Sequence, residues 1–197
     1  MTAPYEWNPM PHRLDVACPQ CGGRAQFEFA ECVRIRLKSD IEFFEASDIF
    51  EYRFVQDRQG QRYHTAHFYP GLHGGGTSAI TELPEGYEPL NWAHSQYLYR
   101  STGIDLGSIR CRGCQYAKKH TLNWPGDAYF KMEYRGRILW AYDLECVHEL
   151  LRYVEDKDRS RDGYKWRPFL REVPTHFLTA KARGAVAKRL RKLMMRE

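Results

Sequence analysis

Apolar and polar residues alternate along much of the first two thirds of the chain, a pattern typical of β-strands. Between residues 24 and 38 the alternation is interrupted at Glu31, so we expect a bulge or two shorter strands there. Residues 50–55 and 61–68 alternate on either side of the polar stretch Gln56–Gly60 and predict a β-hairpin. Residues 92–100 fit either a short helix or a strand.

A second hairpin and two helices are predicted toward the C-terminus. Residues 128–134 and 137–142 flank the dipeptide Arg135-Gly136, which suits a tight turn. Asp143 suits the N-cap of a helix that extends to about residue 156, and Thr175 suits the cap of a helix that extends to about residue 195. Apolar residues recur along that last helix at helical spacing: Leu178, Ala182, Val186, Leu190 and Leu193.

Prolines and glycines mark the connections between these elements. Residues 1–14 predict an extended arm, and residues 70–89, with five glycines and three prolines, predict a long exposed loop. Residues 118–123 predict another strand. The sequence therefore predicts an α+β protein with two C-terminal helices. A β-rich body would cover residues 1–156, and a linker with a basic helix would cover residues 157–197.

Charge is distributed unevenly along the 197 residues, whose net charge is +5. Residues 1–158 hold 18 Lys and Arg against 22 Asp and Glu, whereas residues 159–197 hold 12 against 3. This asymmetry favours an acidic partner. No apolar run is long enough to predict a membrane span, and the first residues lack the pattern of a secretory signal. We therefore expect a cytoplasmic protein with reduced cysteines.

Four of the six cysteines form two C-x-x-C pairs, Cys18/Cys21 and Cys111/Cys114. Four thiolates can close a tetrahedral zinc site. The pairs resemble the knuckles of the zinc-ribbon family, which commonly read C-P-x-C-G and C-x-x-C, and the resemblance implies that all four cysteines bind a structural Zn²⁺. Residues 22–110 separate the pairs here, where about 15–20 residues are typical. We therefore expect a β unit inserted between the two knuckles.

Three other interpretations of the cysteine pairs compete with a single zinc site: a redox pair, two separate metal sites and unliganded thiols. A redox pair belongs between a strand and a helix, which neither pair clearly does. His64 and His67 could join one pair, although their odd spacing places them on opposite faces of a strand. With His73 they are simply explained as surface or half-buried imidazoles. The remaining Cys32 and Cys146 lie among apolar residues and should be buried.

Catalytic motifs find little support in the sequence. The run His73-Gly74-Gly75-Gly76 resembles the oxyanion loop of lipases, but no G-x-S-x-G nucleophile motif occurs. Thr77 stands where a phosphate loop requires lysine. Asp127, with Glu133 and Arg135 on one strand face, distantly resembles the carboxylate set of restriction-type nucleases. Arginine cannot act as a base, however, so a surface ion pair is the simpler interpretation.

Basic residues gather near the second cysteine pair and along the last helix. A cationic helix face suits the phosphate backbone of nucleic acid, although a solvated face or one lying on an anionic membrane has a similar composition. The candidate nucleic-acid contacts are Arg112, Lys118, Lys119, Lys181, Arg183, Lys188, Arg189, Arg191 and Lys192.

These patterns predict a non-catalytic, zinc-stabilised protein that binds nucleic acid, either DNA or RNA, through its basic C-terminal helix. One alternative is a zinc-stabilised adaptor or scaffold subunit that binds another protein through residues 71–76 and aromatic side chains such as Trp92 and Tyr97. A second alternative is a metal-dependent nuclease that uses Asp127 and Glu133.

Overall fold

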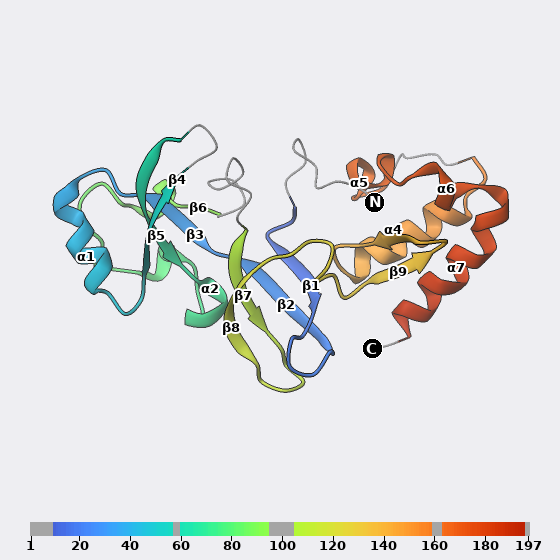
Figure 1. Ribbon diagram of the computed structural model, residues 1–197, viewed down its shortest axis with the longest axis horizontal. Helices are drawn as coiled ribbons and strands as arrows, with labels where there is room; N and C mark the ends of the chain where they lie inside the picture. The colour runs from blue at the N-terminus through green and yellow to red at the C-terminus, as the bar shows by residue number, and fades with distance from the viewer. Residues whose placement is uncertain (1–9, 57–59, 95–104, 159–162, 196–197) are drawn as a thin grey trace.

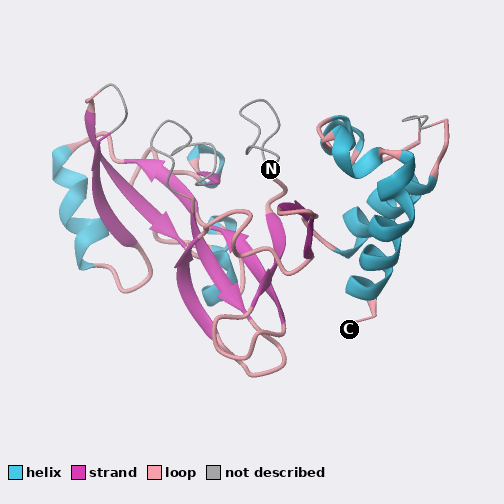
Figure 2. Ribbon diagram, turned by 45° about the vertical axis from the view of Figure 1, so that its right-hand side comes forward, coloured by secondary structure: helices cyan, strands magenta, loops and turns pink. Residues whose placement is uncertain are grey.

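The computed structural model describes residues 10–56, 60–94, 105–158 and 163–195. These residues form an α+β fold whose parts follow one another along the long axis of the molecule (Figure 1). A central sheet lies between a second sheet at one end and a group of helices at the other. Figure 2 shows this C-terminal group of helices beside the C-terminus, away from most of the strands.

The central sheet is antiparallel and has the strand order β1-β2-β7-β8. Its strands are β1 (Arg13–Ala17), β2 (Arg24–Phe29), β7 (Leu106–Arg110) and β8 (Ala117–Thr121). The first cysteine pair occupies the connection from β1 to β2, and the second occupies the connection from β7 to β8. Pairing of β2 with β7 therefore brings the two knuckles to the same end of the sheet.

The second sheet is formed by residues inserted between the two knuckles, as the sequence predicts. It has the order β4-β5-β3-β6 and is antiparallel. Its strands are β3 (Glu31–Arg34), β4 (Glu51–Gln56), β5 (Arg62–Phe68) and β6 (Ala93–His94). The hairpin predicted over residues 50–68 is confirmed, although residues 57–59 of its turn lie outside the described residues. A separate apolar cluster, which includes Phe44, Phe50 and Tyr87, stabilises this unit.

The interruption at Glu31 marks the boundary between the two sheets. Ala30 separates β2 from β3, and the two strands belong to different sheets. Two further short helical segments accompany the inserted unit: η1 (Lys38–Asp40) followed by α1 (Ile41–Ala46). Of the ambiguous segment 92–100, Ala93–His94 are a strand and residues 95–100 lie outside the described residues.

Residues 70–89 are partly buried, so the expectation of a long exposed loop is wrong. This stretch contains α2 (Pro70–His73), η2 (Thr77–Ala79) and the start of η3 (Pro89–Asn91). α2 packs on the central sheet, where a Cβ on Gly71 would lie 2.5 Å from Ser108 Oγ. Only a residue without a side chain permits this close approach.

The C-terminal third begins with the predicted hairpin of β9 (Lys131–Tyr134) and β10 (Arg137–Trp140). Its turn residues Arg135 and Gly136 have positive φ values of 52° and 73°. Four helices follow: α4 (Leu144–Glu155), α5 (Arg167–Arg171), α6 (Thr175–Leu178) and α7 (Ala180–Met194). Asp143 caps α4 as predicted, because its Oδ1 accepts a hydrogen bond from the Cys146 N–H at 2.7 Å.

The predicted single helix from Thr175 to about residue 195 is instead two helices. Thr179 is extended, with φ −65° and ψ 152°, and separates α6 from α7. Its Oγ1 accepts a hydrogen bond from the Ala182 N–H at 3.2 Å, so Thr179 rather than Thr175 caps the long basic helix. The expected apolar stripe is nevertheless largely correct, since Val186, Leu190 and Leu193 are buried.

The main apolar core extends from the central sheet into the helical end of the molecule. It includes Phe27 on β2, Trp140 on β10, Leu150 on α4 and Val186 on α7. α7 packs against α4 and β9. The basic helix therefore shares its core with the β-rich body, and the boundary proposed at residue 157 stays a prediction. Within the described part of the chain, every helix is too short or too polar to cross a membrane.

Candidate metal centre

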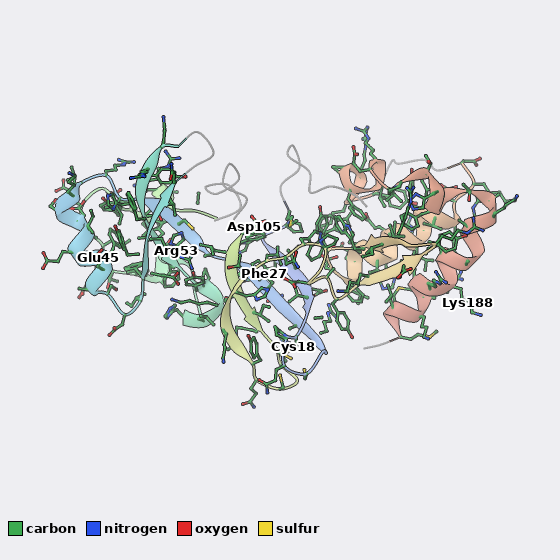
Figure 3. All side chains as sticks on the ribbon, in the orientation of Figure 1. Cys18, Phe27, Glu45, Arg53, Asp105 and Lys188 are labelled. Carbon is green, nitrogen blue, oxygen red and sulfur yellow. The ribbon has the colours of Figure 1, made fainter. Side chains whose placement is uncertain are left out.

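The four cysteines of the two pairs converge at one end of the central sheet, where Figure 3 labels Cys18. Their sulfur atoms all lie within 4.8 Å of one another. Cys18 Sγ lies 3.6 Å from Cys114 Sγ, and Cys21 Sγ lies 3.7 Å from Cys111 Sγ. The cluster is compatible with the knuckle pair of a zinc ribbon, as the sequence predicts.

Two of the sulfur separations match those that a tetrahedral metal requires. A Zn–S bond of about 2.3 Å in a tetrahedron places the sulfur atoms about 3.8 Å apart. The Cys18–Cys114 and Cys21–Cys111 separations are close to that value, and no two of the four sulfur atoms are more than 4.8 Å apart. The four thiols can therefore hold one metal ion, and a set of four leaves the ion no open position for water.

Backbone hydrogen bonds shape each knuckle. In the first, the Cys18 carbonyl accepts a hydrogen bond from the Gly22 N–H at 2.9 Å, and the Cys18 N–H donates to the Gly23 carbonyl at 2.8 Å. Gly22 has a φ of 70°, a conformation that glycine adopts at little cost. In the second, the Cys111 N–H donates to the Tyr116 carbonyl at 2.8 Å. The turns thus direct both sulfurs of each pair to the same side.

The thiols of the cluster differ in acidity. Burial raises the pKa of Cys18, but hydrogen bonds from the backbone of Cys21 and Gln20 and from neighbouring thiols outweigh it and lower that pKa to about 7. A hydrogen bond with the backbone of Tyr116 lowers the pKa of Cys114, yet desolvation and the other three thiols raise it to about 12. Cys18 is therefore a thiolate ligand already available near neutral pH.

No histidine joins the cluster, and no second group of metal-ligating side chains converges among the described residues. Buried His67 has its Nδ1 3.0 Å from the Glu51 carbonyl oxygen, and His64 has its Nδ1 2.6 Å from the Tyr52 hydroxyl. The ring of His73 stacks on Phe68. The geometry thus favours one four-cysteine site over a mixed site.

The remaining cysteines are buried apolar side chains, as predicted. Cys32 and Cys146 are at most 1% exposed. Burial raises the pKa of both thiols well above the usual value. Such cysteines are inert packing groups rather than ligands.

The carboxylates considered for a nuclease have structural partners. Asp127 Oδ2 lies 2.8 Å from His120 Nε2 and accepts a hydrogen bond from the Asn123 N–H at 2.7 Å. Glu133 is exposed on β9. The expectation that Glu133 and Arg135 share a strand face is wrong, because β9 ends at Tyr134 and Arg135 lies in the turn.

The predicted basic contacts are separated in space. Lys181, Lys188 and Lys192 form an exposed row on α7, and Figure 3 shows Lys188 directed away from the body. None of the three forms an ion pair with another described residue. Other basic side chains of α7 contact the body: Arg191 pairs with Glu155, Arg189 donates to the Glu133 carbonyl and Arg183 is half-buried.

The predicted basic residues near the second knuckle also differ in their surroundings. Lys119 pairs with Glu51 at 2.7 Å, and Lys118 Nζ lies 5.8 Å from the centre of the Tyr116 ring. Arg112 is exposed and lines a pocket together with two further arginines, Arg24 and Arg110. These two were not predicted as functional residues. Their only signal in the sequence is their position next to the knuckles.

Comparisons with protein-family models, with curated proteins and with solved structures found no match to this chain.

Proposed function

We propose that the four cysteines bind one structural Zn²⁺ and that the protein is a non-catalytic nucleic-acid-binding protein. Zinc bound by four thiolates stabilises the folded state and has no open coordination position for a substrate or water. Its place at the end of the central sheet suits that role, because it ties the β1–β2 hairpin to the β7–β8 hairpin. Stable thiolate ligands suit a reducing compartment, and we propose a cytoplasmic location.

The observation that carries the nucleic-acid proposal is the exposed lysine row of α7. Lys181, Lys188 and Lys192 are spaced by seven and four residues, so they lie on one side of the helix. The opposite side is anchored in the core through Val186, and the ion pair of Arg191 with Glu155 joins α7 to α4. The row is thus held on a rigid element, free of carboxylate partners in the described chain, and suits a phosphate backbone.

The test is binding of a fluorescently labelled oligonucleotide across a series of salt concentrations. We expect the logarithm of the affinity to fall linearly with the logarithm of the salt concentration. The variant Lys181→Ala/Lys188→Ala/Lys192→Ala should flatten that slope by about 2 to 3, since each lost phosphate contact contributes about 0.7 to 0.9. The variant Arg36→Ala/Lys38→Ala/Arg62→Ala removes three exposed charges from the inserted unit and serves as the control. Equal slopes in both variants would exclude α7 as the binding element.

One observation favours the adaptor alternative. Leu37, Phe43, Ile49 and Phe54 are between 39% and 62% exposed on the inserted unit. Such side chains can form the apolar part of a protein interface. The ratio of absorbance at 260 and 280 nm of the purified protein distinguishes the nucleic-acid-binding function from the adaptor function, because retained nucleic acid raises this ratio. Protein free of nucleic acid that also fails to bind the oligonucleotide would favour the adaptor.

A further inference from the structure

A pocket of about 720 Å³ lies beside the second knuckle, over the end of the central sheet that carries the cysteine pairs. Its size is that of sites that hold small ligands or a single nucleotide. Polar side chains dominate its lining: Arg24, Arg110, Arg112, Gln26, Gln115 and Tyr116. Neither the metal centre nor the lysine row of α7 accounts for this concentration of arginine.

The register of the sheet explains why these residues share one face. Asp15 on β1, Gln26 on β2, Arg110 on β7 and Ala117 on β8 are direct neighbours across the four strands. Arg24 lies two residues from Gln26 and so projects from the same face. This row forms the floor of the pocket.

The charges of the pocket are unbalanced in favour of an anion. Asp15, its one lining carboxylate, pairs with Arg24 at 3.0 Å, and the Arg24 guanidinium also lies 5.5 Å from the centre of the Phe130 ring. Arg24 is therefore held in place. Arg110 and Arg112 are exposed and form no ion pair with another described residue. Two guanidinium groups thus remain available to a ligand.

The metal centre positions these arginines relative to one another. Cys111 stands between Arg110 and Arg112 in the chain, lines the pocket, and has its Sγ 3.8 Å from the Arg24 carbonyl oxygen. The Cys111 N–H also fixes Tyr116 through its carbonyl, at 2.8 Å. These contacts hold β2, which carries Arg24, against β7, which carries Arg110, next to the second knuckle. The arginines are therefore held in position before a ligand binds.

We propose that this pocket binds one phosphate-bearing nucleotide of a single-stranded nucleic acid. Arg110 and Arg112 contact phosphate oxygens through their planar guanidinium forks, and the Tyr116 ring forms a wall against which the base stacks. A single strand is favoured because its bases can leave the stack and enter a concave site, whereas duplex bases are paired inside the helix. The inference rests on the nucleic-acid function proposed above and assigns it a second binding element.

The experiment measures binding of a fluorescein-labelled single-stranded oligothymidylate and of a labelled duplex by anisotropy. The unlabelled single strand and the unlabelled duplex serve as competitors. We expect Arg110→Ala/Arg112→Ala to weaken binding roughly tenfold or more, because charge-assisted hydrogen bonds are lost. The salt slope should flatten by about 1 to 2. The control Arg36→Ala/Lys38→Ala removes two exposed basic residues with the same spacing, and it should leave both quantities unchanged.

The outcomes separate this inference from the function on which it rests. If the unaltered protein binds neither strand nor duplex, the nucleic-acid function fails, and the pocket proposal fails with it. If the strand binds and Arg110→Ala/Arg112→Ala retains its affinity and slope, only the pocket proposal is overturned. Competition by the duplex as strong as by the single strand would also overturn it. Should the alanine variant unfold, Arg110→Lys/Arg112→Lys provides the test. This variant keeps the positive charges but loses the planar guanidinium groups that contact phosphate through two hydrogen bonds. Unchanged affinity would contradict the proposal.

Discussion

Glu51 and Lys119 join the two sheets of the molecule. The Lys119 Nζ on β8 donates to Glu51 Oε2 on β4 at 2.7 Å, across 68 residues of sequence. The Tyr69 hydroxyl donates to the same oxygen at 3.0 Å, and Arg53 pairs with the other carboxylate oxygen. Burial raises the pKa of the Glu51 carboxyl, but these three partners together lower it to about 2. One carboxylate thus connects the inserted unit to the central sheet.

Removing this carboxylate should destabilise the protein more than removing a surface acid. Glu51→Ala leaves the Tyr69 hydroxyl without its partner, on a side chain that is 2% exposed. We expect a loss of about 1 to 3 kcal/mol in the free energy of unfolding. The control Glu145→Ala removes an exposed ion pair with Lys165 and should cost below about 1 kcal/mol. Urea unfolding measures both values, and equal losses would show that the Glu51 contacts do not stabilise the fold.

Stability should also fall with acid because of His67. Burial lowers the pKa of His67 to about 4, and the positive charges of Arg53 and Lys119 also lower it. The hydrogen bond to the Glu51 carbonyl and the negative charge of the Glu51 carboxylate raise the pKa but do not offset this effect. The folded state therefore favours the neutral imidazole. The contribution of neutral His67 to the free energy of unfolding is complete above the ordinary pKa of 6.5, and it is lost as the pH falls from 6.5 toward 4. Glu51 acts lower, between its ordinary pKa of 4.5 and about 2.

The pH interval between about 4.5 and 6.5 consequently separates His67 from Glu51. Burial also lowers the pKa of His176 below 6.5, so only the difference between the unaltered protein and a His67 variant reports His67. In that interval the unaltered protein should lose up to about 1.4 kcal/mol of stability per pH unit from this group. His67→Asn keeps a donor for the Glu51 carbonyl oxygen but cannot titrate, so its stability should vary less with pH. Denaturant unfolding at several pH values gives the comparison. Parallel curves for the two proteins would contradict the assignment.

Features that depend on local chemistry were predictable from the sequence. The knuckles were recognisable because a turn with two cysteines separated by two residues can place both sulfurs on one metal ion. Asp143 was recognisable as a cap because it directly precedes the helical apolar pattern, and the N–H that it caps, that of Cys146, is only three residues away. The hairpin of residues 51–68 was evident from alternation on both sides of a polar turn. Each signal lies within a few residues of chain.

Features that depend on distant contacts were not predictable. Gly71 resembled a loop residue, yet it packs on Ser108 of the central sheet. The break at Thr179 falls inside a continuous apolar stripe, so periodicity alone could not locate it. The arginine pocket exists only because β2 pairs with β7, which brings Arg24 near Arg110. The only sequence signal for this proximity is that each arginine lies next to a cysteine pair.

Two glycines should respond to alanine in opposite directions. A Cβ at Gly107 on β7 would lie 2.3 Å from the Glu28 carbonyl oxygen and 2.3 Å from Phe27 Cζ. Because the backbone cannot move aside without breaking the β2–β7 pairing, Gly107→Ala should cost about 3 kcal/mol. A Cβ at Gly184 on α7 would meet nothing within 4 Å. Gly184→Ala should therefore stabilise the protein by about 0.5 to 1 kcal/mol. Thermal unfolding measures both variants: an unchanged or raised unfolding temperature in Gly107→Ala would refute this packing at β7, and a lowered one in Gly184→Ala would refute the open space at α7.

The metal centre gives the final prediction. We expect the purified protein to contain about one zinc per chain, and Cys18→Ala to abolish this, because three thiols no longer complete the tetrahedron. Loss of the metal releases the β1–β2 hairpin from the β7–β8 hairpin, so the unfolding temperature should fall. A strong chelator should lower the unfolding temperature of the unaltered protein toward that of the variant and have no effect on the variant itself.

Cys32→Ala is the matched control, because Cys32 is 1% exposed and lies outside the cluster. It should keep the full zinc content while losing about 1 kcal/mol to the small cavity it leaves. Metal content is measured by elemental analysis after dialysis. Zinc retained by Cys18→Ala, or lost equally from both variants, would contradict the assignment of the four cysteines, since Cys18 belongs to the cluster and Cys32 does not.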